Sequence, residues 1–339
     1  MSLIARLFWS QFFGILFLGV AVADDGLFTA NEVLDVVLTG PVDKTARDKR
    51  RPRERVFRIA VGDAEWPVEV RTRGKSRLVY CGFPPLRLNF AEDELASGPF
   101  VGLDKMKLVT QCRDSSTSRD DLFEEYAAYR MLNEVTALSH RVRLLRIRYV
   151  DSDNPQRDPL VQYAFAIEPQ EQVARRNGAD ALAVKHLGVS RVNREQAALV
   201  FVFQYLIANI DWSLVRAKDA DECCHNMKVL TAEDEQLLIP YDFDLSGLVN
   251  ARYARRLPNM RKSSVRERQY MGYCLGGLDL SAAVALFVAR KKPIMAVLDE
   301  LDWNNAAETQ KRVAFLEEFF AEAADEGLAE RLAKDCVGK

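Results

Sequence analysis

Apolar and polar residues alternate along several short stretches in the first half of the chain. These stretches are Val56–Val61, Val68–Thr72, Leu86–Phe90, Lys105–Thr110, Arg141–Val150 and Gln162–Ile167. A two-residue period places alternate side chains on opposite faces of an extended chain. The pattern therefore predicts a strand at each stretch, and in Arg141–Val150 it predicts a strand with one arginine-rich face.

Helical spacing dominates the second half. Apolar residues recur at helical spacing in Asp120–Leu138, and Asn193–Asn209 is apolar nearly all round, which is typical of a buried helix. Met227–Leu230 and Leu237–Pro240 predict a hairpin, and Leu280–Ala289, Met295–Leu301 and Ala306–Ala333 predict helices. A strand-rich half followed by a helical half predicts an α+β fold with two lobes and a cleft between them.

The first 23 residues resemble a secretory signal peptide. Arg6 precedes the mostly apolar run Leu7–Val20, and Ala21-Val22-Ala23 has the pattern of small residues at a cleavage site. An uncleaved anchor is the alternative, but the run is short for a spanning helix, which needs about 20 residues. We therefore expect an exported protein, periplasmic or extracellular, with no integral membrane segment after cleavage.

Charge and cysteine content narrow the class of protein. The net charge is −2, and the loss of Arg6 on cleavage would make it about −3, so no basic excess points to nucleic acid. Six cysteines in an exported chain predict disulfides, with Cys81 and Cys112 the first expected pair because they flank two predicted strands. The Cys223-Cys224-His225 run could form a metal cluster, but its spacing matches no standard zinc site, which favours disulfide bonding.

These patterns divide the mature chain into three parts. Residues 24–55 are expected to be an extended arm or loop, residues 56–168 a strand-rich unit, and residues 169–335 a helical unit.

Four acidic or amide residues follow one another in the helical half. Asp211 lies on a turn after the buried helix, Asn226 precedes the predicted hairpin, and Asp242 and Asp244 follow its second strand. If the chain is extended there, the last two carboxylates face the same side, and a divalent cation is a natural way to hold them together. Phosphoryl transfer requires such a set: one Asp that orients a hydroxyl, and an Asn and an Asp that hold metal.

Basic residues in the strand-rich half could bind phosphate. Lys105 and Lys107 share one face of a predicted strand, and Glu124 or Glu125 on the next helix could hold one of them. A further set, Arg71, Arg73 and Arg77, surrounds a glycine, but neither a Walker pattern nor a kinase-type glycine-rich loop is present.

The same residues resemble a known family, the CotH-type (spore-coat protein kinase-like) atypical secreted kinases. The similar segments are "RTRGKSR" (71–77), "CGFPPLRLNF" (81–90), "KLVTQC" (107–112), the stretch 125–151, "NIDWS", "HNMKVL" and "PYDFDLSGLVNARYA", and together they cover roughly residues 27–275. The resemblance implies a bilobal protein-kinase-like fold with a strand-rich N-lobe (56–168) and a helical C-lobe (169–335). It also implies transfer of phosphate from ATP to protein hydroxyls, with Mg²⁺ or Mn²⁺.

The resemblance also assigns roles to the candidate residues. It implies Asp211 as the catalytic residue, Asn226 and Asp242 (with Asp244 beside it) as metal ligands, and Ala166–Glu168 as the hinge beside the adenine. It further implies that Lys107, or alternatively Lys105, contacts the nucleotide phosphates. Glu125 would pair with Lys107. Arg73 is the candidate phosphate contact outside that pair. The acceptor protein is not indicated.

One spacing departs from typical kinases. Asn226 lies 15 residues after Asp211, where kinases leave about five, so the insert "LVRAKDADECC" must form a loop. Two other functions therefore stay open: a weak or inactive envelope binding or scaffold protein (a pseudokinase), and a kinase that phosphorylates a sugar or lipid hydroxyl.

Overall fold

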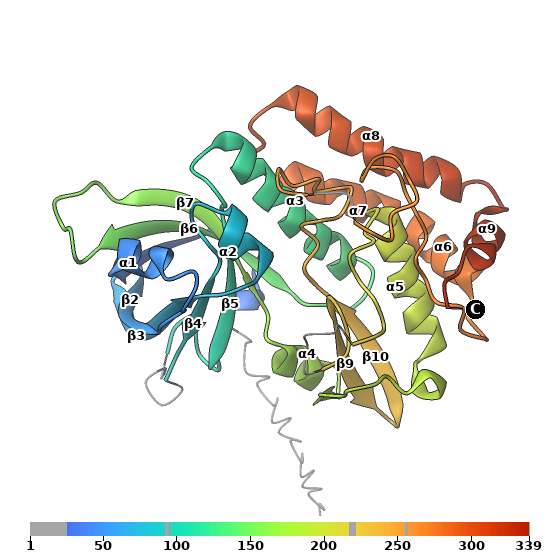
Figure 1. The fold of residues 1–339 in the computed structure, drawn as a ribbon, viewed down its shortest axis with the longest axis horizontal. Helices are drawn as coiled ribbons and strands as arrows, with labels where there is room; N and C mark the ends of the chain where they lie inside the picture. Colours follow the sequence, from blue (N-terminus) through green and yellow to red (C-terminus); the bar gives the residue numbers. More distant parts are fainter. Residues whose placement is uncertain (1–25, 92–94, 96, 217–221, 255–256, 339) are drawn as a thin grey trace, which may run out of the picture.

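The computed structural model describes residues 26–91, 95, 97–216, 222–254 and 257–338. The predicted signal peptide lies outside these ranges. In the described part, a β-barrel occupies the first half and a mainly helical region with a small sheet occupies the second (Figure 1).

The barrel is closed by seven strands in the order β1-β2-β3-β4-β5-β7-β6. Their bounds are β1 Leu34–Gly40, β2 Arg55–Val61, β3 Ala64–Thr72, β4 Leu86–Asn89, β5 Lys105–Thr110, β6 Val142–Asp151 and β7 Leu160–Ile167. All neighbours are antiparallel except β1 and β6, whose parallel pairing closes the barrel. Inward residues such as Phe57, Val70, Leu88, Met106 and Ile147 form one apolar core. The two-residue period thus produces the barrel interior.

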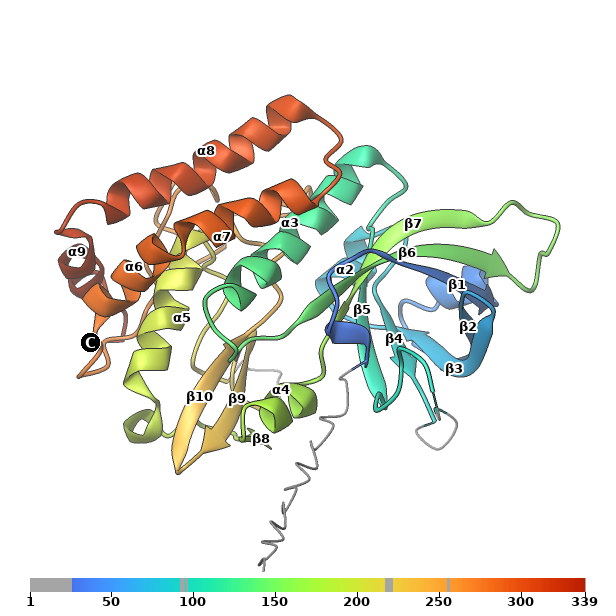
Figure 2. The same cartoon turned by 180° about the vertical axis from the view of Figure 1, so that it is seen from behind.

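The second region packs helices against one face of the barrel. Its elements are α3 Ser116–Asn133, α4 Gln170–Arg176, β8 Asp180–Leu182, α5 Arg194–Leu206, β9 Met227–Ala232, β10 Glu235–Pro240, α6 Leu280–Ala289, α7 Lys291–Ala296, α8 Ala306–Ala323 and α9 Leu328–Lys334, with short 3₁₀ turns Gly26–Phe28, Val189–Arg191 and Val297–Glu300. Strands β8, β9 and β10 form a separate sheet. Helix α3 lies between the barrel and the other helices (Figure 2), and a second apolar core joins it to β6, β7, α5 and the C-terminal helices. This core fixes α3 relative to the ends of α5 and β10.

The expected bilobal protein-kinase-like fold, with a strand-rich N-lobe and a helical C-lobe, is wrong. The strands form a closed mixed barrel of seven rather than the sheet of a kinase-like lobe. The reason is β1, which lies in the segment 24–55 that was expected to be an arm or loop. It pairs with β2 on one side and with β6 on the other, so the two edges that the other strands would leave open are joined. The same segment also contains helix α1, Val42–Arg47.

Other local predictions agree with the structure. Each of the expected strands is present, β9 and β10 form the expected hairpin, and Arg146 and Arg148 lie on the exposed face of β6. Helix α3 begins earlier than expected because Ser115 caps its N-terminus by accepting a hydrogen bond from the backbone of Ser118. The long helix expected at Ala306–Ala333 is divided into α8 and α9. Over the described ranges, none of the helices is long and apolar enough to cross a membrane.

All six cysteines are paired in the structure. Cys81 and Cys112 form the expected bond, Cys274 bonds Cys336, and Cys223 bonds its neighbour Cys224. The metal cluster considered for Cys223-Cys224-His225 is therefore not formed, because both sulfur atoms are bonded to each other.

Candidate functional site

The turn that carries Asp211 is shaped by a buried amide. Asn209 is 1% exposed, and its side-chain oxygen accepts a hydrogen bond from the backbone N–H of Asp211 at 3.0 Å. Its backbone carbonyl accepts a hydrogen bond from the indole of Trp212 at 3.1 Å. These bonds fix the direction of the Asp211 side chain at the C-terminal end of α5.

Asp211 is brought next to His225 and Asn226 despite their separation in the chain. Ser213 and His225 exchange backbone hydrogen bonds of 3.1 and 3.2 Å, which closes the loop between them; part of the insert, residues 217–221, lies outside the described residues. The Asn226 amide donates to Asp211 Oδ2 at 3.0 Å, and His225 Nε2 lies 3.0 Å from Asp211 Oδ1. The hydrogen bond between His225 and Asp211 raises the pKa of His225. The long spacing therefore still places Asn226 against Asp211.

Asp242 and Asp244 do not follow the extended geometry expected for them. The backbone of Asp242 has φ 64°, in the left-handed region, and its N–H donates to the buried hydroxyl of Tyr129 at 2.8 Å. The Asp242 side chain is 45% exposed, whereas that of Asp244 is 5% exposed. Phe243 is fully buried, and its ring contacts those of Tyr129 and Phe203. The two carboxylates therefore differ in exposure, but both lie close to one cation.

That cation is Arg77, which the sequence had not singled out as a pairing residue. Its Nε donates to Asp244 Oδ2 at 3.0 Å, its Nη2 lies 4.0 Å from Asp242 Oδ1, and it also donates to Glu125. Tyr253 donates to the same Asp244 oxygen at 2.8 Å. Burial raises the pKa of Glu125, and the Arg77 guanidinium opposes that shift. The expected Lys107–Glu125 pair is absent from the contacts of the described residues, and Arg77 occupies the place of that lysine.

Glu124 and Lys105, the alternatives left open, lie elsewhere. Glu124 is buried against Arg312, whose Nε donates to it at 2.6 Å. Burial raises the pKa of Glu124 to about 8. Lys105 is exposed and pairs with Asp104 at 2.9 Å. The structure therefore places Glu125, and not Glu124, in the acidic cluster. Lys107 lies nearer to that cluster than Lys105.

A basic cavity of about 670 Å³ is lined in part by Arg73 and Lys107, which interact electrostatically with Asp242. Arg71, Arg87 and Lys107 are aligned across β3, β4 and β5, so their side chains form one row on the outer face of the barrel. The basic residues that line the cavity are Arg71, Arg73, Arg87, Lys105, Lys107, Arg175 and Lys228, and the acidic residues are Asp104, Glu168 and Glu171. This excess of cations favours an anionic ligand with several charges.

The electrostatics join the cavity to the acidic cluster. Burial, together with the charges of Arg73 and Lys228, lowers the pKa of Lys107 to about 8, and Asp242 partly opposes this shift. Burial likewise lowers the pKa of Arg73, again opposed by Asp242. The Lys107 ammonium lies over the ring of Tyr241, 5.0 Å from its centroid. The cavity thus contains destabilised cations directly beside a carboxylate.

Glu168 forms part of the cavity wall. Its carboxylate accepts hydrogen bonds from Arg176 Nε at 2.9 Å and from the backbone of Arg141 at 2.8 Å. Its carbonyl lies 2.8 Å from His140 Nδ1, and burial lowers the pKa of His140 to about 3. These contacts fix Glu168 firmly, and its role beside an adenine stays a prediction.

The donor set suits a metal that is shared with a phosphate ligand. Within the described ranges, no group of three or more His, Cys, Asp or Glu side chains could hold a metal ion alone. Asp244 is occupied by Arg77 and Tyr253, and the nitrogen of Asn226 is occupied by Asp211. Asp242 and the amide oxygen of Asn226 are then the available ligands, and Mg²⁺ commonly uses one or two protein oxygens plus phosphate and water.

Comparison of the chain with protein-family models and with curated proteins finds no match.

Proposed function

We propose that this protein is an exported, divalent-metal-dependent phosphotransferase that transfers the terminal phosphate of ATP to a protein hydroxyl. We also propose that it is a member of the CotH-type kinase family, on the segments that resemble it. One observation carries the proposal: two cations of the basic cavity, Lys107 and Arg73, interact electrostatically with Asp242. Asp242 interacts in turn with Asp211, which is hydrogen-bonded to Asn226. Phosphoryl transfer depends on this combination of phosphate-binding cations with carboxylates that hold metal and hydroxyl.

Each residue has a distinct role in this proposal. Lys107 and Arg73 bind the phosphates, and Tyr129 and Arg77 position Asp242 through the contacts described above. The acceptor oxygen forms a bond to the terminal phosphorus while the bond from that phosphorus to the bridging oxygen breaks, and ADP leaves. The hydroxyl proton passes to Asp211.

A divalent metal, when bound, would neutralise charge on the phosphates. Asp242 and the amide oxygen of Asn226 are the residues that would hold Mg²⁺ or Mn²⁺. His225 affects the proton transfer because it shares Asp211 Oδ1. Since that contact raises the pKa of His225, the imidazolium is retained to higher pH and competes with the acceptor hydroxyl for Asp211 Oδ1. We therefore expect transfer to increase as pH rises through the pKa of His225.

Two measurements test the proposal in sequence. The thermal stability of the mature chain is measured with ATP and Mg²⁺ or Mn²⁺, for wild type, Asp242→Ala and the control Asp302→Ala, which changes an exposed aspartate outside the site. A ligand at 100-fold its Kd stabilises the folded state by about 2.7 kcal/mol. We expect this metal-dependent gain in wild type and in the control, and its loss in Asp242→Ala.

Transfer is then measured with ATP labelled at the terminal phosphate, using the chain itself and casein as acceptors. Asp211→Asn should keep the thermal shift and lose transfer. Equal transfer by Asp211→Asn and wild type would contradict the role of Asp211, and the absence of any metal-dependent shift in wild type would refute nucleotide binding.

A second candidate, nucleotide binding without turnover, is favoured by a specific observation. Both carboxylate oxygens of Asp211 contact protein groups, and Asp244 is held by Arg77 and Tyr253. A chain that used these contacts for shape alone would bind metal and ATP as an envelope scaffold. A thermal shift without labelled product in wild type would support this function over the first.

A further inference from the structure

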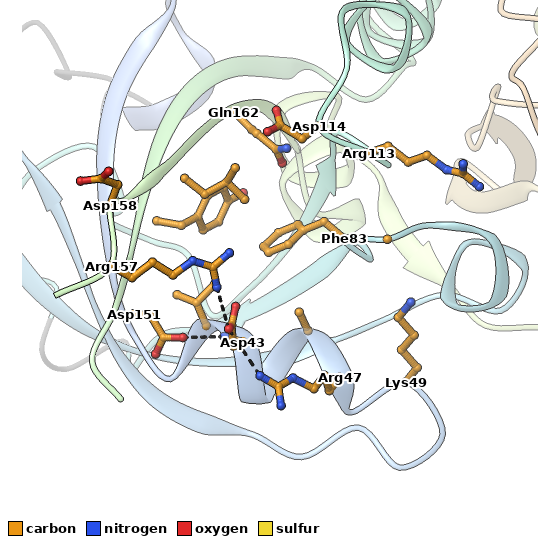
Figure 3. A pocket seen from close by; sticks show the side chains of 15 residues that line it. Asp43, Arg47, Lys49, Phe83, Arg113, Asp114, Asp151, Arg157, Asp158 and Gln162 are labelled. Atoms are coloured by element: carbon orange, nitrogen blue, oxygen red, sulfur yellow. Dashed lines mark hydrogen bonds and ion pairs between the residues drawn. The ribbon is translucent and has the colours of Figure 1, made fainter. Parts of the chain in front are cut away.

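Two cavities of the described chain differ sharply in charge. The cavity at one mouth of the barrel, of about 540 Å³, is lined by four basic and four acidic residues. Figure 3 shows Asp43 of this cavity joined by dashed lines to Arg47 and Arg157, and Arg157 donates to it at 2.7 Å. The basic cavity beside Lys107 is lined by seven basic and three acidic residues. Of the two, the basic cavity therefore has positive charge to offer an anionic ligand.

Several cations of the basic cavity lack a carboxylate partner. Arg71, Lys105 and Lys228 each form an ion pair with a nearby carboxylate. Within the described ranges, the other four basic residues of the lining form none, and these are Arg73, Arg87, Lys107 and Arg175. Arg175 is exposed and the other three are partly exposed. These side chains therefore have surface that a ligand in the cavity can contact.

The cations lie in a row rather than around a point. Arg87 is paired in register with Arg71 on one neighbouring strand and with Lys107 on the other. Adjacent strands are about 4.8 Å apart, so three cationic side chains follow one another across the outer face of the barrel. Arg175, in the last turn of α4, lines the same cavity. Such a row matches a chain of linked phosphates, whose negative charges also follow one another.

The backbone expected to lie beside an adenine, Ala166–Glu168, is already paired. Ile167 is paired in register with β5 on one side and with β6 on the other. The backbone N–H of Glu168 donates to the carbonyl of Arg141 at 2.9 Å, and the Glu168 carbonyl lies 2.8 Å from Nδ1 of His140. A base in the cavity would therefore have no open strand edge to pair with among these residues.

The basic cavity also offers little apolar surface to a base. Met106 and Ile167 belong to the lining but are 0% and 6% exposed. Pro52 and Pro169 are the more accessible apolar side chains of the lining. Ligand pockets are usually lined mainly by hydrophobic and aromatic side chains, so two proline rings give a purine little to pack on.

We propose that the basic cavity recognises a phosphate donor by its phosphate chain and does not discriminate the base, so that GTP and inorganic tripolyphosphate serve in place of ATP. Discrimination among bases requires polar groups that pair with the base, and the described residues of the cavity hold theirs in other contacts. This inference rests on the proposed function and specifies its donor.

The transfer step is the same for each donor. With tripolyphosphate, the acceptor oxygen forms a bond to a terminal phosphorus while the bond from that phosphorus to the bridging oxygen breaks. Pyrophosphate then leaves in place of ADP, and the hydroxyl proton passes to Asp211.

Calorimetry on the mature chain in excess Mg²⁺ tests this inference with ATP, GTP, inorganic tripolyphosphate and adenosine. We expect the first three to bind with Kd values within about threefold of one another, and adenosine not to bind. Arg87→Met and Arg175→Met should each weaken all three by about tenfold, because each removes a cation from the row. The matched control is Arg157→Met, which removes an exposed arginine of the other cavity that Asp43 already neutralises, and it should leave all three Kd values unchanged.

The possible failures are distinguishable. An ATP Kd more than about tenfold below those of GTP and tripolyphosphate would overturn this inference and leave the proposed function standing, because the base would then contribute to binding. Binding of adenosine would overturn it in the same way. Wild-type Kd values in both Arg87→Met and Arg175→Met would show that the row of cations does not hold the phosphate chain. The absence of binding by ATP and by every other donor would refute nucleotide binding itself, and this inference with it.

Discussion

Replacement of Lys107 by methionine is expected to stabilise the free protein and to weaken phosphate binding. The Lys107 side chain is partly buried, and desolvation together with the charges of Arg73 and Lys228 lowers its pKa from 10.5 to about 8. A lysine with a lowered pKa opposes folding wherever it is still charged, because the unfolded chain binds the proton more tightly. Methionine keeps an unbranched apolar stem and removes the charge.

The magnitude follows from the shift. The difference between 10.5 and about 8, at 1.36 kcal/mol per pKa unit, is roughly 3 kcal/mol of opposition to folding at pH 7. Partial exposure of Lys107 screens this energy, and the contact with the Tyr241 ring, worth about 0.5–1 kcal/mol, is lost. We therefore expect Lys107→Met to gain about 1–2 kcal/mol of unfolding free energy at pH 7.

The sign of the pH dependence is fixed by the same shift. Below about pH 8 the folded and unfolded chains are both protonated at Lys107, and the full cost applies. Between about 8 and 10.5 the folded chain has lost the proton and the unfolded chain still binds it, so wild-type stability rises relative to the variant. The advantage of Lys107→Met should be largest at pH 7 and shrink through this window.

Urea unfolding at pH 7 and near pH 9.5 measures both effects. Lys105→Met is the matched control, because Lys105 is exposed on the same strand and should change stability by less than about 0.5 kcal/mol. The reasoning would be refuted if Lys107→Met were less stable than wild type at pH 7. It would also be refuted if the difference in unfolding free energy between variant and wild type were the same at both pH values. Loss of the metal-dependent ATP shift in this more stable variant would separate binding from folding.

Three further changes have defined outcomes in urea unfolding. Arg77→Met should cost about 3–5 kcal/mol, because Glu125 and Asp244 stay buried without their cation, and a loss below about 1 kcal/mol would contradict the ion pair. Tyr129→Phe should lose about 1–3 kcal/mol of unfolding free energy and weaken metal-dependent ATP binding, because the Asp242 N–H loses its acceptor. Unchanged ATP binding would show that this hydrogen bond does not position Asp242. The double variant Cys81→Ala, Cys112→Ala should lose about 3–4 kcal/mol, since the bond spans 31 residues, and wild-type stability would show that the bond adds nothing.

The local elements were predictable because their patterns are local. Alternation over a few residues is sufficient to identify β2 to β7, and the apolar segment before Asp211 is sufficient to identify α5. Strand β1 was missed because its second partner, β6, lies about a hundred residues away, and only that parallel pairing closes the barrel. A wrong overall architecture could thus follow from largely correct elements.

The site was predictable in part for the same reason. Asp211, Asn226 and Asp242 were found from short motifs, and the structure brings them together. Arg77 was missed as a pairing residue because its partners Glu125 and Asp244 are 48 and 167 residues away in the chain. The stretch "RTRGKSR" was the available signal, but a basic stretch alone does not identify which cation is buried. The left-handed backbone of Asp242 was also not predictable, because a two-residue period assumes an extended chain.

The charge balance around Arg77 explains why the acidic cluster suits a cation. One guanidinium contacts three carboxylates, those of Glu125, Asp242 and Asp244. Two negative charges are therefore left without a partner in that contact set, and desolvation together with the neighbouring Asp244 raises the pKa of Asp242. Burial raises the pKa of Glu125 to about 8, so protonation of Glu125 relieves one of these charges at neutral pH, and a cation bound at Asp242 can offset the other. Asp242 is the exposed carboxylate of the three, and it interacts electrostatically with Arg73 and Lys107. A cation at Asp242 would therefore be held where the phosphates of a nucleotide would also bind.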